Sequence, residues 1–177
     1  MDMKAPVLFV AHLDTVQKLM DPRSIRIDDN RIHATGLDDR LGCYLAFRLN
    51  LLGIRGDVLL CDHEETNETT AKYFETDKHY NWVAEFDREG TQAVTYGDDS
   101  ILFLKTLKKC GFKLNRGVGS DISELTLPND PCMINIGVGY EKPHSLDSYL
   151  DISNLVSNVR KFSKFYRKYS STSYIIE

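Results

Sequence analysis

The chain has 177 residues, a length typical of one domain with its own core. Hydrophobic residues make up 42% and charged residues 27%, with 22 Lys and Arg against 26 Asp and Glu, so the net charge is −4. We therefore expect no nucleic-acid partner bound through bulk positive charge, and no membrane partner because no apolar run reaches the length of a membrane span.

Short apolar runs bounded by polar or turn residues predict strands along the chain. They lie at residues 6–13, 57–61, 82–86, 93–96 and 132–138, with a hairpin at 24–34. Helical spacing of apolar residues predicts helices at 41–52, 100–111 and 151–169, and a further helix is expected at 67–76. Because strands and helices alternate, we predict an α/β layer fold in one domain, residues 5–169, followed by a C-terminal tail, residues 170–177.

The cysteines are widely separated and show no clustered zinc-binding spacing. They are Cys43, Cys61, Cys110 and Cys132. We expect reduced thiols, most of them in the core. The N-terminal segment also lacks the layout of a signal peptide, so the expected location is cytoplasmic.

Polar side chains gather where the predicted buried strands end. These are His12 and Asp14, Glu64 and Glu65, Asp87, and His144 in the loop after the last strand. In open α/β sheets ligands bind at the carboxyl ends of the strands, so these distant residues are expected to converge on one site. Histidine nitrogen and carboxylate oxygen are ligands of catalytic zinc, and a pair of metal ions can share a carboxylate.

Taken in chain order, the chain contains six short motifs: His12-Leu13-Asp14, the run Gly36-Leu37-Asp38-Asp39-Arg40-Leu41-Gly42, Asp62-His63-Glu64-Glu65-Thr66, Asp87, Gly119-Ser120-Asp121 and Pro143-His144-Ser145. They resemble those of the di-zinc exopeptidase superfamily, whose members include leucyl aminopeptidases, peptidase T and carboxypeptidase G. Each motif alone is weak, whereas the ordered set, which spans residues 12–155, is specific. The resemblance implies a three-layer fold, with a mixed, mostly parallel sheet and helices on both faces.

The same resemblance implies a site for two zinc ions, which Co²⁺ or Mn²⁺ could replace. His12 and Asp87 would bind one ion, Glu65 and His144 the other, and Asp38 would bridge them. The second aspartate of the pair, Asp39, is expected to cap a helix or support the site instead of binding metal.

Glu64 would act as general base and acid, and Asp14 would hydrogen-bond the far nitrogen of His12 and fix its tautomer. Three further residues are candidates for substrate contact: Ser120, Asp121 and Tyr140. For the first two a plain turn is the alternative, and for the tyrosine a packing role.

The chain departs from the family in ways that bear on function. Between Asp87 and Gly119 there is no room for a lid or dimerisation domain, so we expect a bare catalytic core, whose sheet edge a second copy of the chain could cover. Where relatives that act as carboxypeptidases often have an Arg, this chain has Ile122-Ser123-Glu124. The leading hypothesis is an aminopeptidase or small-peptide hydrolase. The alternatives are an amidohydrolase of N-acyl or conjugated small molecules, and a non-catalytic metal-binding recognition protein.

Overall fold

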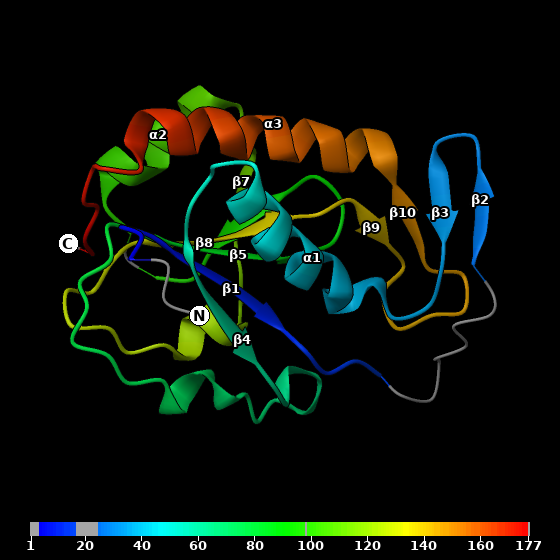
Figure 1. Cartoon of the computed structure of the whole chain (residues 1–177), viewed down its shortest axis with the longest axis horizontal. Coiled ribbons are helices and arrows are strands. Elements are labelled where there is room, and N and C mark those ends of the chain that lie inside the picture. The colour runs from blue at the N-terminus through cyan, green and yellow to red at the C-terminus, as the bar shows by residue number, and fades with distance from the viewer. Residues whose placement is uncertain (1–3, 17–24, 98, 177) are drawn as a thin grey trace.

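The computed structural model describes residues 4–16, 25–97 and 99–176. Its centre is a six-stranded sheet in the order β4-β1-β5-β8-β6-β7 (Figure 1). The strands are β1 (Leu8–His12), β4 (Asp57–Cys61), β5 (Val83–Arg88), β6 (Ala93–Thr95), β7 (Leu114–Arg116) and β8 (Met133–Gly137). Strands β4, β1, β5 and β8 are parallel, whereas β6 is antiparallel to β8 and parallel to β7. The predicted mixed, mostly parallel sheet is confirmed.

The central strands are apolar on both faces because both faces are covered. All five residues of β1 are buried. Phe9 packs into the larger of two hydrophobic clusters, while its neighbours Leu8 and Val10 point into the smaller cluster across the sheet. The two clusters define the layers on either side of the sheet.

The three α-helices all pack into the larger cluster, on one face of the sheet. They are α1 (Leu37–Leu51), α2 (Ile101–Cys110) and α3 (Ile152–Tyr169). The other face is covered by short 3-10 helices, η3 (Thr70–Tyr73) and η4 (Asp121–Glu124), with the loops beside them. Both faces therefore carry helices, but of different kinds. Among the described residues, no helix has the length and apolar character needed to cross a bilayer.

The prediction of a helix at residues 67–76 is wrong for most of that segment. The segment holds only η3, preceded by η2 (Glu64–Thr66), and Thr69 caps η3 by accepting a hydrogen bond from the backbone N–H of Ala71 at 3.0 Å. A threonine hydroxyl that bonds its own backbone competes with α-helix formation.

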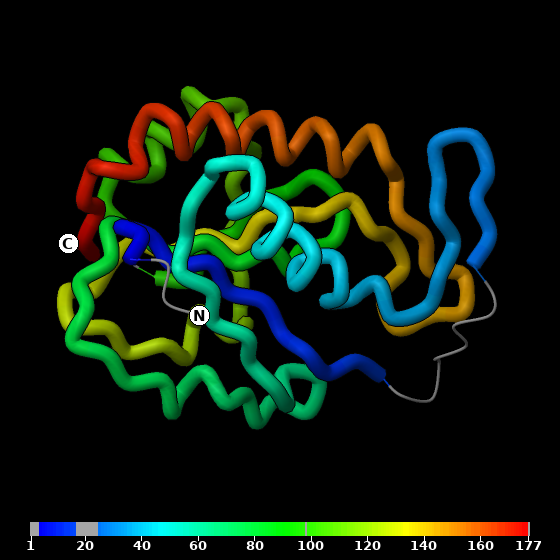
Figure 2. Tube along the Cα trace, in the orientation of Figure 1, coloured from blue at the N-terminus to red at the C-terminus, as the bar shows by residue number. Residues whose placement is uncertain are grey.

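A second, antiparallel sheet lies at the end of the molecule opposite the C-terminus (Figure 2). Its order is β2-β3-β10-β9, from β2 (Arg26–Asp28), β3 (Arg31–His33), β9 (Tyr140–Glu141) and β10 (Tyr149–Asp151). The predicted hairpin supplies β2 and β3, although its first residue, Ser24, lies outside the described residues. Since β9 and β10 flank His144, this sheet holds both ends of the loop that carries it.

The segment expected to be a tail is held against the end of the main sheet by Tyr174, and the backbone N–H of Ile176 donates to the carbonyl of Asp130 at 2.9 Å. Tyr174 is 3% exposed, and its backbone N–H donates to the carbonyl of Asn81 at 2.8 Å. Its carbonyl accepts from the N–H of Cys132, also at 2.8 Å. The C-terminal residues thus complete the end of the sheet at which β5 and β8 begin. All four cysteines are free thiols.

Phe162 on α3 is the centre of an aromatic cluster and is 1% exposed. Its ring centroid lies 5.0 Å from that of Phe86, 5.7 Å from Phe9 and 6.0 Å from Trp82. We expect Phe162→Ala to lower the free energy of unfolding by about 3–5 kcal/mol in denaturant titrations, because it leaves a cavity. Val156→Ala, at a position of the same helix that is 39% exposed, should cost within about 1 kcal/mol. Equal losses would contradict this packing.

Candidate functional site

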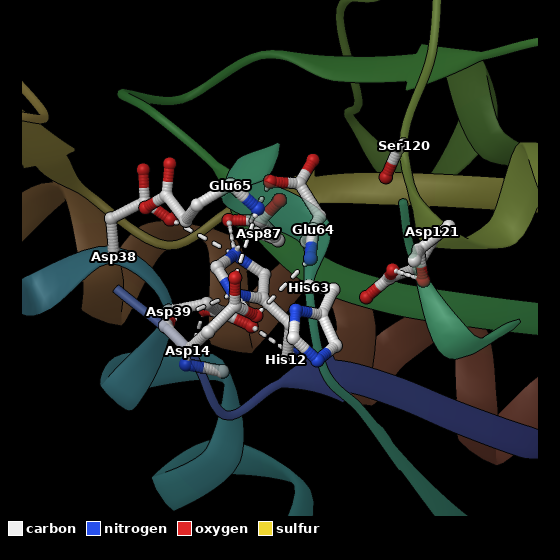
Figure 3. Close-up of polar contacts among 12 residues, drawn as sticks. His12, Asp14, Asp38, Asp39, His63, Glu64, Glu65, Asp87, Ser120 and Asp121 are labelled. Atoms are coloured by element: carbon white, nitrogen blue, oxygen red, sulfur yellow. Dashed lines mark hydrogen bonds and ion pairs between the residues drawn. The ribbon is translucent and has the colours of Figure 1, made fainter. Parts of the chain in front are cut away.

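The ends of parallel strands bring the candidate site together (Figure 3). His12 is the last residue of β1, and Glu64 and Glu65 form the turn η2 just beyond β4. Asp87 lies near the end of β5, and Asp38 lies at the start of α1. These strands are neighbours in the sheet, so their carboxyl ends place the side chains on one edge.

Five side chains form two groups of potential metal ligands that share Asp38. The first is His12, Asp38 and Asp87, the second is Asp38, Glu65 and His144, and within each group the ligand atoms lie within 4.8 Å of one another. Nε2 of His12 lies 3.3 Å from Oδ1 of Asp38 and 3.6 Å from Oδ1 of Asp87. Nε2 of His144 lies 3.2 Å from Oδ2 of Asp38 and 2.8 Å from Oε2 of Glu65. Asp38 thus turns one oxygen towards each histidine, as a carboxylate shared by two ions would.

Asp39 fixes the backbone around these ligands from a fully buried position. Asp38 and Asp39, in the first turn of α1, have non-helical dihedral angles, and the peptide bond between them is cis. The Asp39 carboxylate accepts hydrogen bonds from the N–H of Gly42 at 2.8 Å and from the N–H of His12 at 3.3 Å. Any side chain at Gly42 would overlap that carboxylate. Asp39 therefore caps the regular part of the helix and lies outside both ligand groups.

Asp14 connects His12 to the glutamate turn. Its Oδ1 lies 3.3 Å from Nδ1 of His12, and its backbone oxygen lies 3.0 Å from the same nitrogen. Its carboxylate also accepts from the N–H groups of Glu64 at 3.2 Å and Glu65 at 3.0 Å. A proton on Nδ1 leaves Nε2 of His12 free to bind a metal ion.

The electrostatics of the site fit a bound cation. Burial, and then the charge of neighbouring carboxylates, holds the pKa of Asp87 well above its usual range. Burial also raises the pKa of Glu65, where Asp38 adds to the effect. Nε2 of His12 and Oε1 of Glu65 are buried without a hydrogen bond among the described residues, which is costly. A divalent ion would satisfy these atoms and offset the negative charge, and the nitrogen and carboxylate donors suit Zn²⁺, Co²⁺ or Mn²⁺.

The same shifts predict how the metal-free protein responds to pH. Burial raises the pKa of Asp39 and Asp87 above their unfolded values. For His12, burial lowers the pKa, but the facing Asp38 and Asp87 carboxylates outweigh it and raise the pKa. The folded state then binds more protons than the unfolded state at pH values above about 4, so stability falls as pH rises.

We therefore expect the Tm of the zinc-free protein to fall between about pH 5 and about pH 8, with each kcal/mol lost lowering it by about 2–4 °C. Excess zinc should reverse the trend, because an ion favours ionised carboxylates. Thermal unfolding with and without zinc across this range measures both effects. A Tm that rises with pH in the zinc-free protein would contradict the raised pKa values of these buried carboxylates.

A hollow of about 350 Å³ opens beside the ligand groups. Its lining consists of Glu64, Asn67, Thr69, Lys72, Val118, Gly119, Ser120 and Glu124. Oε2 of Glu64 lies 3.9 Å from Nε2 of His12, and Glu64 also lines the hollow together with Ser120, towards which its side of the cluster faces in Figure 3. Burial raises the pKa of Glu64.

The three predicted substrate residues have different surroundings. Ser120 lines the hollow, and its hydroxyl donates to the buried carboxylate of Glu85. Asp121 is fully buried and accepts a hydrogen bond from the hydroxyl of Thr69, which itself lines the hollow. Tyr140 is also buried, and its hydroxyl donates to Oδ1 of Asp87 at 3.2 Å. Direct substrate contact stays a prediction for all three, and the burial of Asp121 and Tyr140 favours the alternatives of a turn and a packing role.

Two buried polar residues next to the site were not identified from the sequence: Glu85 on β5 and Asn135 on β8. Each is a polar residue inside an otherwise apolar strand, VAEFDR and MINIG. Because buried polar groups need hydrogen-bonding partners, a polar residue within an apolar strand is the sequence pattern that could have identified both residues.

No family model and no curated protein sequence matches this chain, but solved structures share its fold. The crystal structure of aminopeptidase PepT from Bacillus cereus ATCC 10987 matches with a TM-score of 0.66 at 13% identity, covering 93% of this chain and 80% of that one. A tripeptidase from Staphylococcus aureus subsp. aureus Mu50 matches with a TM-score of 0.56 at 12% identity, covering 94% and 82%. PhTET1-12s, a dodecamer in its asymmetric unit, matches with a TM-score of 0.51 at 16% identity, covering 78% and 53%. The likeness confirms the predicted α/β fold.

Proposed function

We propose that this chain is a metal-dependent hydrolase of amide bonds, acting as an aminopeptidase or small-peptide hydrolase. The observation that carries the proposal is the pair of ligand groups joined by Asp38, with Glu64 both close to His12 and lining an open hollow. Two proteins that share the fold are an aminopeptidase and a tripeptidase, which supports a peptide substrate.

The proposed cofactor is a pair of zinc ions. His12 and Asp87 would hold one, Glu65 and His144 the other, and Asp38 both. Zinc bound there supplies Lewis-acid chemistry, which polarises a carbonyl oxygen and lowers the pKa of water from about 15.7 to about 7.

Glu64 is the proposed general base and acid. It takes a proton from the attacking water and returns it to the leaving amine, a transfer that a carboxylate performs best when its pKa lies near the working pH. The raised pKa of Glu64 moves it in that direction. Asp14 is a positioning residue, since it holds the backbone N–H groups of both glutamates and Nδ1 of His12.

The hollow beside Glu64 is the proposed place for the substrate. Its wall combines the hydroxyl of Ser120, the amide of Asn67 and the charged side chains of Lys72 and Glu124. A lining of this kind suits a short polar peptide, whose backbone and termini offer both donors and acceptors.

Metal content and turnover, measured on the same zinc-equilibrated sample, test the proposal. We expect two ions per chain and hydrolysis of aminoacyl anilides and of dipeptides or tripeptides with a free N-terminus. Turnover of N-acyl amino acids alone would shift the assignment to an amidohydrolase. Bound zinc without turnover of either class would indicate a recognition protein. A chain that binds no zinc would overturn the ligand assignment and the catalytic role with it.

A further inference from the structure

Asn135 is a buried side-chain amide, 1% exposed, that hydrogen-bonds both backbone groups of Asp87. Its Oδ1 accepts from the N–H of Asp87 at 3.0 Å, and its Nδ2 donates to the carbonyl of Asp87 at 3.4 Å. The amide therefore pairs with Asp87 as a peptide unit of a neighbouring strand would.

A bulge in β5 explains why this pairing is needed. Glu85 is opposite Asn135, but the next pair joins Arg88 with Gly137, so β5 has one residue more than β8 over this stretch. A bulge interrupts the ladder and re-aims the side chains within it. Without Asn135 the N–H of Asp87 would lose the partner described for it, its carbonyl would keep only the hydroxyl of Tyr140 at 3.4 Å, and the direction of its carboxylate would be less firmly fixed.

The same amide reaches the wall of the hollow. Nδ2 of Asn135 lies 3.1 Å from Oγ of Ser120 and 3.2 Å from the hydroxyl oxygen of Tyr96. Ser120 lines the hollow, so one side chain joins its wall to the strand segment that carries Asp87. Tyr140 holds the carboxylate of Asp87 from another direction.

We propose that Asn135 is a positioning residue that sets the Asp87 carboxylate against His12 and Asp38. It thereby controls the metal affinity of that ligand group and leaves the group of Glu65 and His144 unaffected. The hydrogen bonds described for Asn135 reach Asp87, Ser120 and Tyr96, and none reaches Glu65 or His144. The inference rests on the proposed function, because it takes Asp87 as a metal ligand.

Competition between the protein and a zinc chelator of known affinity tests this role. Asn135→Ala should weaken zinc binding at one position by about 10–100-fold, the usual effect of removing a residue that orients a ligand, and leave the other position unchanged. Asp87→Ala identifies the affected position, since it removes the ligand itself. The matched control is Asn158→Ala, which removes another buried amide, 2% exposed, that donates to the carbonyl of Gly137 on the same strand. It should lower the Tm and change neither zinc affinity.

The outcomes separate the two proposals. A wild type that binds no zinc overturns the proposed function, and the role of Asn135 with it. If the wild type binds two ions and Asn135→Ala reduces both zinc affinities equally, or reduces neither, only the positioning role is overturned. If Asn135→Ala does not fold, Tyr96→Phe decides. It removes one hydroxyl partner of the amide and should give a smaller loss at the same position, and unchanged affinities there would overturn the role.

Discussion

Glu64→Gln is expected to lower kcat by about 10²–10⁴-fold while the bound zinc stays at the wild-type level. Glutamine has the shape of glutamate, and the backbone N–H that donates to Asp14 is untouched, so the turn should keep its structure. The amide cannot accept and return a proton at the rate of a carboxylate. Single-turnover and steady-state rates on an aminoacyl anilide, together with zinc analysis of the same sample, measure the effect.

Glu124→Gln is the matched control for this change. Glu124 lines the same hollow and loses the same charge, but only Glu64 of the two has a described contact with a ligand group, at 3.9 Å from Nε2 of His12. We expect its kcat to remain within about one order of magnitude of wild type. If Glu64→Gln loses zinc in proportion to its rate, Glu64 is a ligand and not the base. If it keeps its rate, another group moves the proton.

Asp38→Asn should remove both zinc ions at concentrations that fill the wild type, and lower activity to that of the chelated enzyme. The reason is that Asp38 is the member common to both ligand groups. An amide offers one weak neutral oxygen where the carboxylate offers two charged ones, each turned to a different histidine. Zinc content after gel filtration and residual turnover give the readout.

Asp87→Asn provides the contrast, since Asp87 belongs only to the group with His12. We expect it to weaken one position and to leave the position of Glu65 and His144 occupied. Retention of one full equivalent of zinc by Asp38→Asn would show that this residue serves a single ion, and the bridging role would have to be abandoned.

The sequence allowed the candidate ligands to be proposed because His12, Glu65 and Asp87 lie at or just after the ends of apolar strands, whereas Asp38 and His144 were placed by the resemblance of their motifs. Such strands can be read from local composition, and parallel strands bring their ends together whatever their order in the chain. His12, Glu65 and Asp87 follow directly from this rule. Their grouping around Asp38 was implied by the resemblance, and the distances group the same residues.

Other features depend on contacts that no local pattern records. Strands β7, β9 and β10 have two or three residues each, and such segments are strands only because they find a partner. The direction of the Tyr140 ring and the burial of Asp121 depend on how distant segments pack. The bulge that makes Asn135 necessary is a mismatch between two strands 48 positions apart at Asp87 and Asn135, which neither strand shows alone.

The second sheet has a consequence for how the protein is made. β3 pairs with β10, so that His33 is opposite Tyr149, and the loop bearing His144 is held only after this long-range pairing. During synthesis His12, Asp38, Glu65 and Asp87 all leave the ribosome before the segment that carries His144. Completion of the second ligand group must therefore follow the emergence of β10, and until then a nascent chain would expose an incomplete, strongly acidic site.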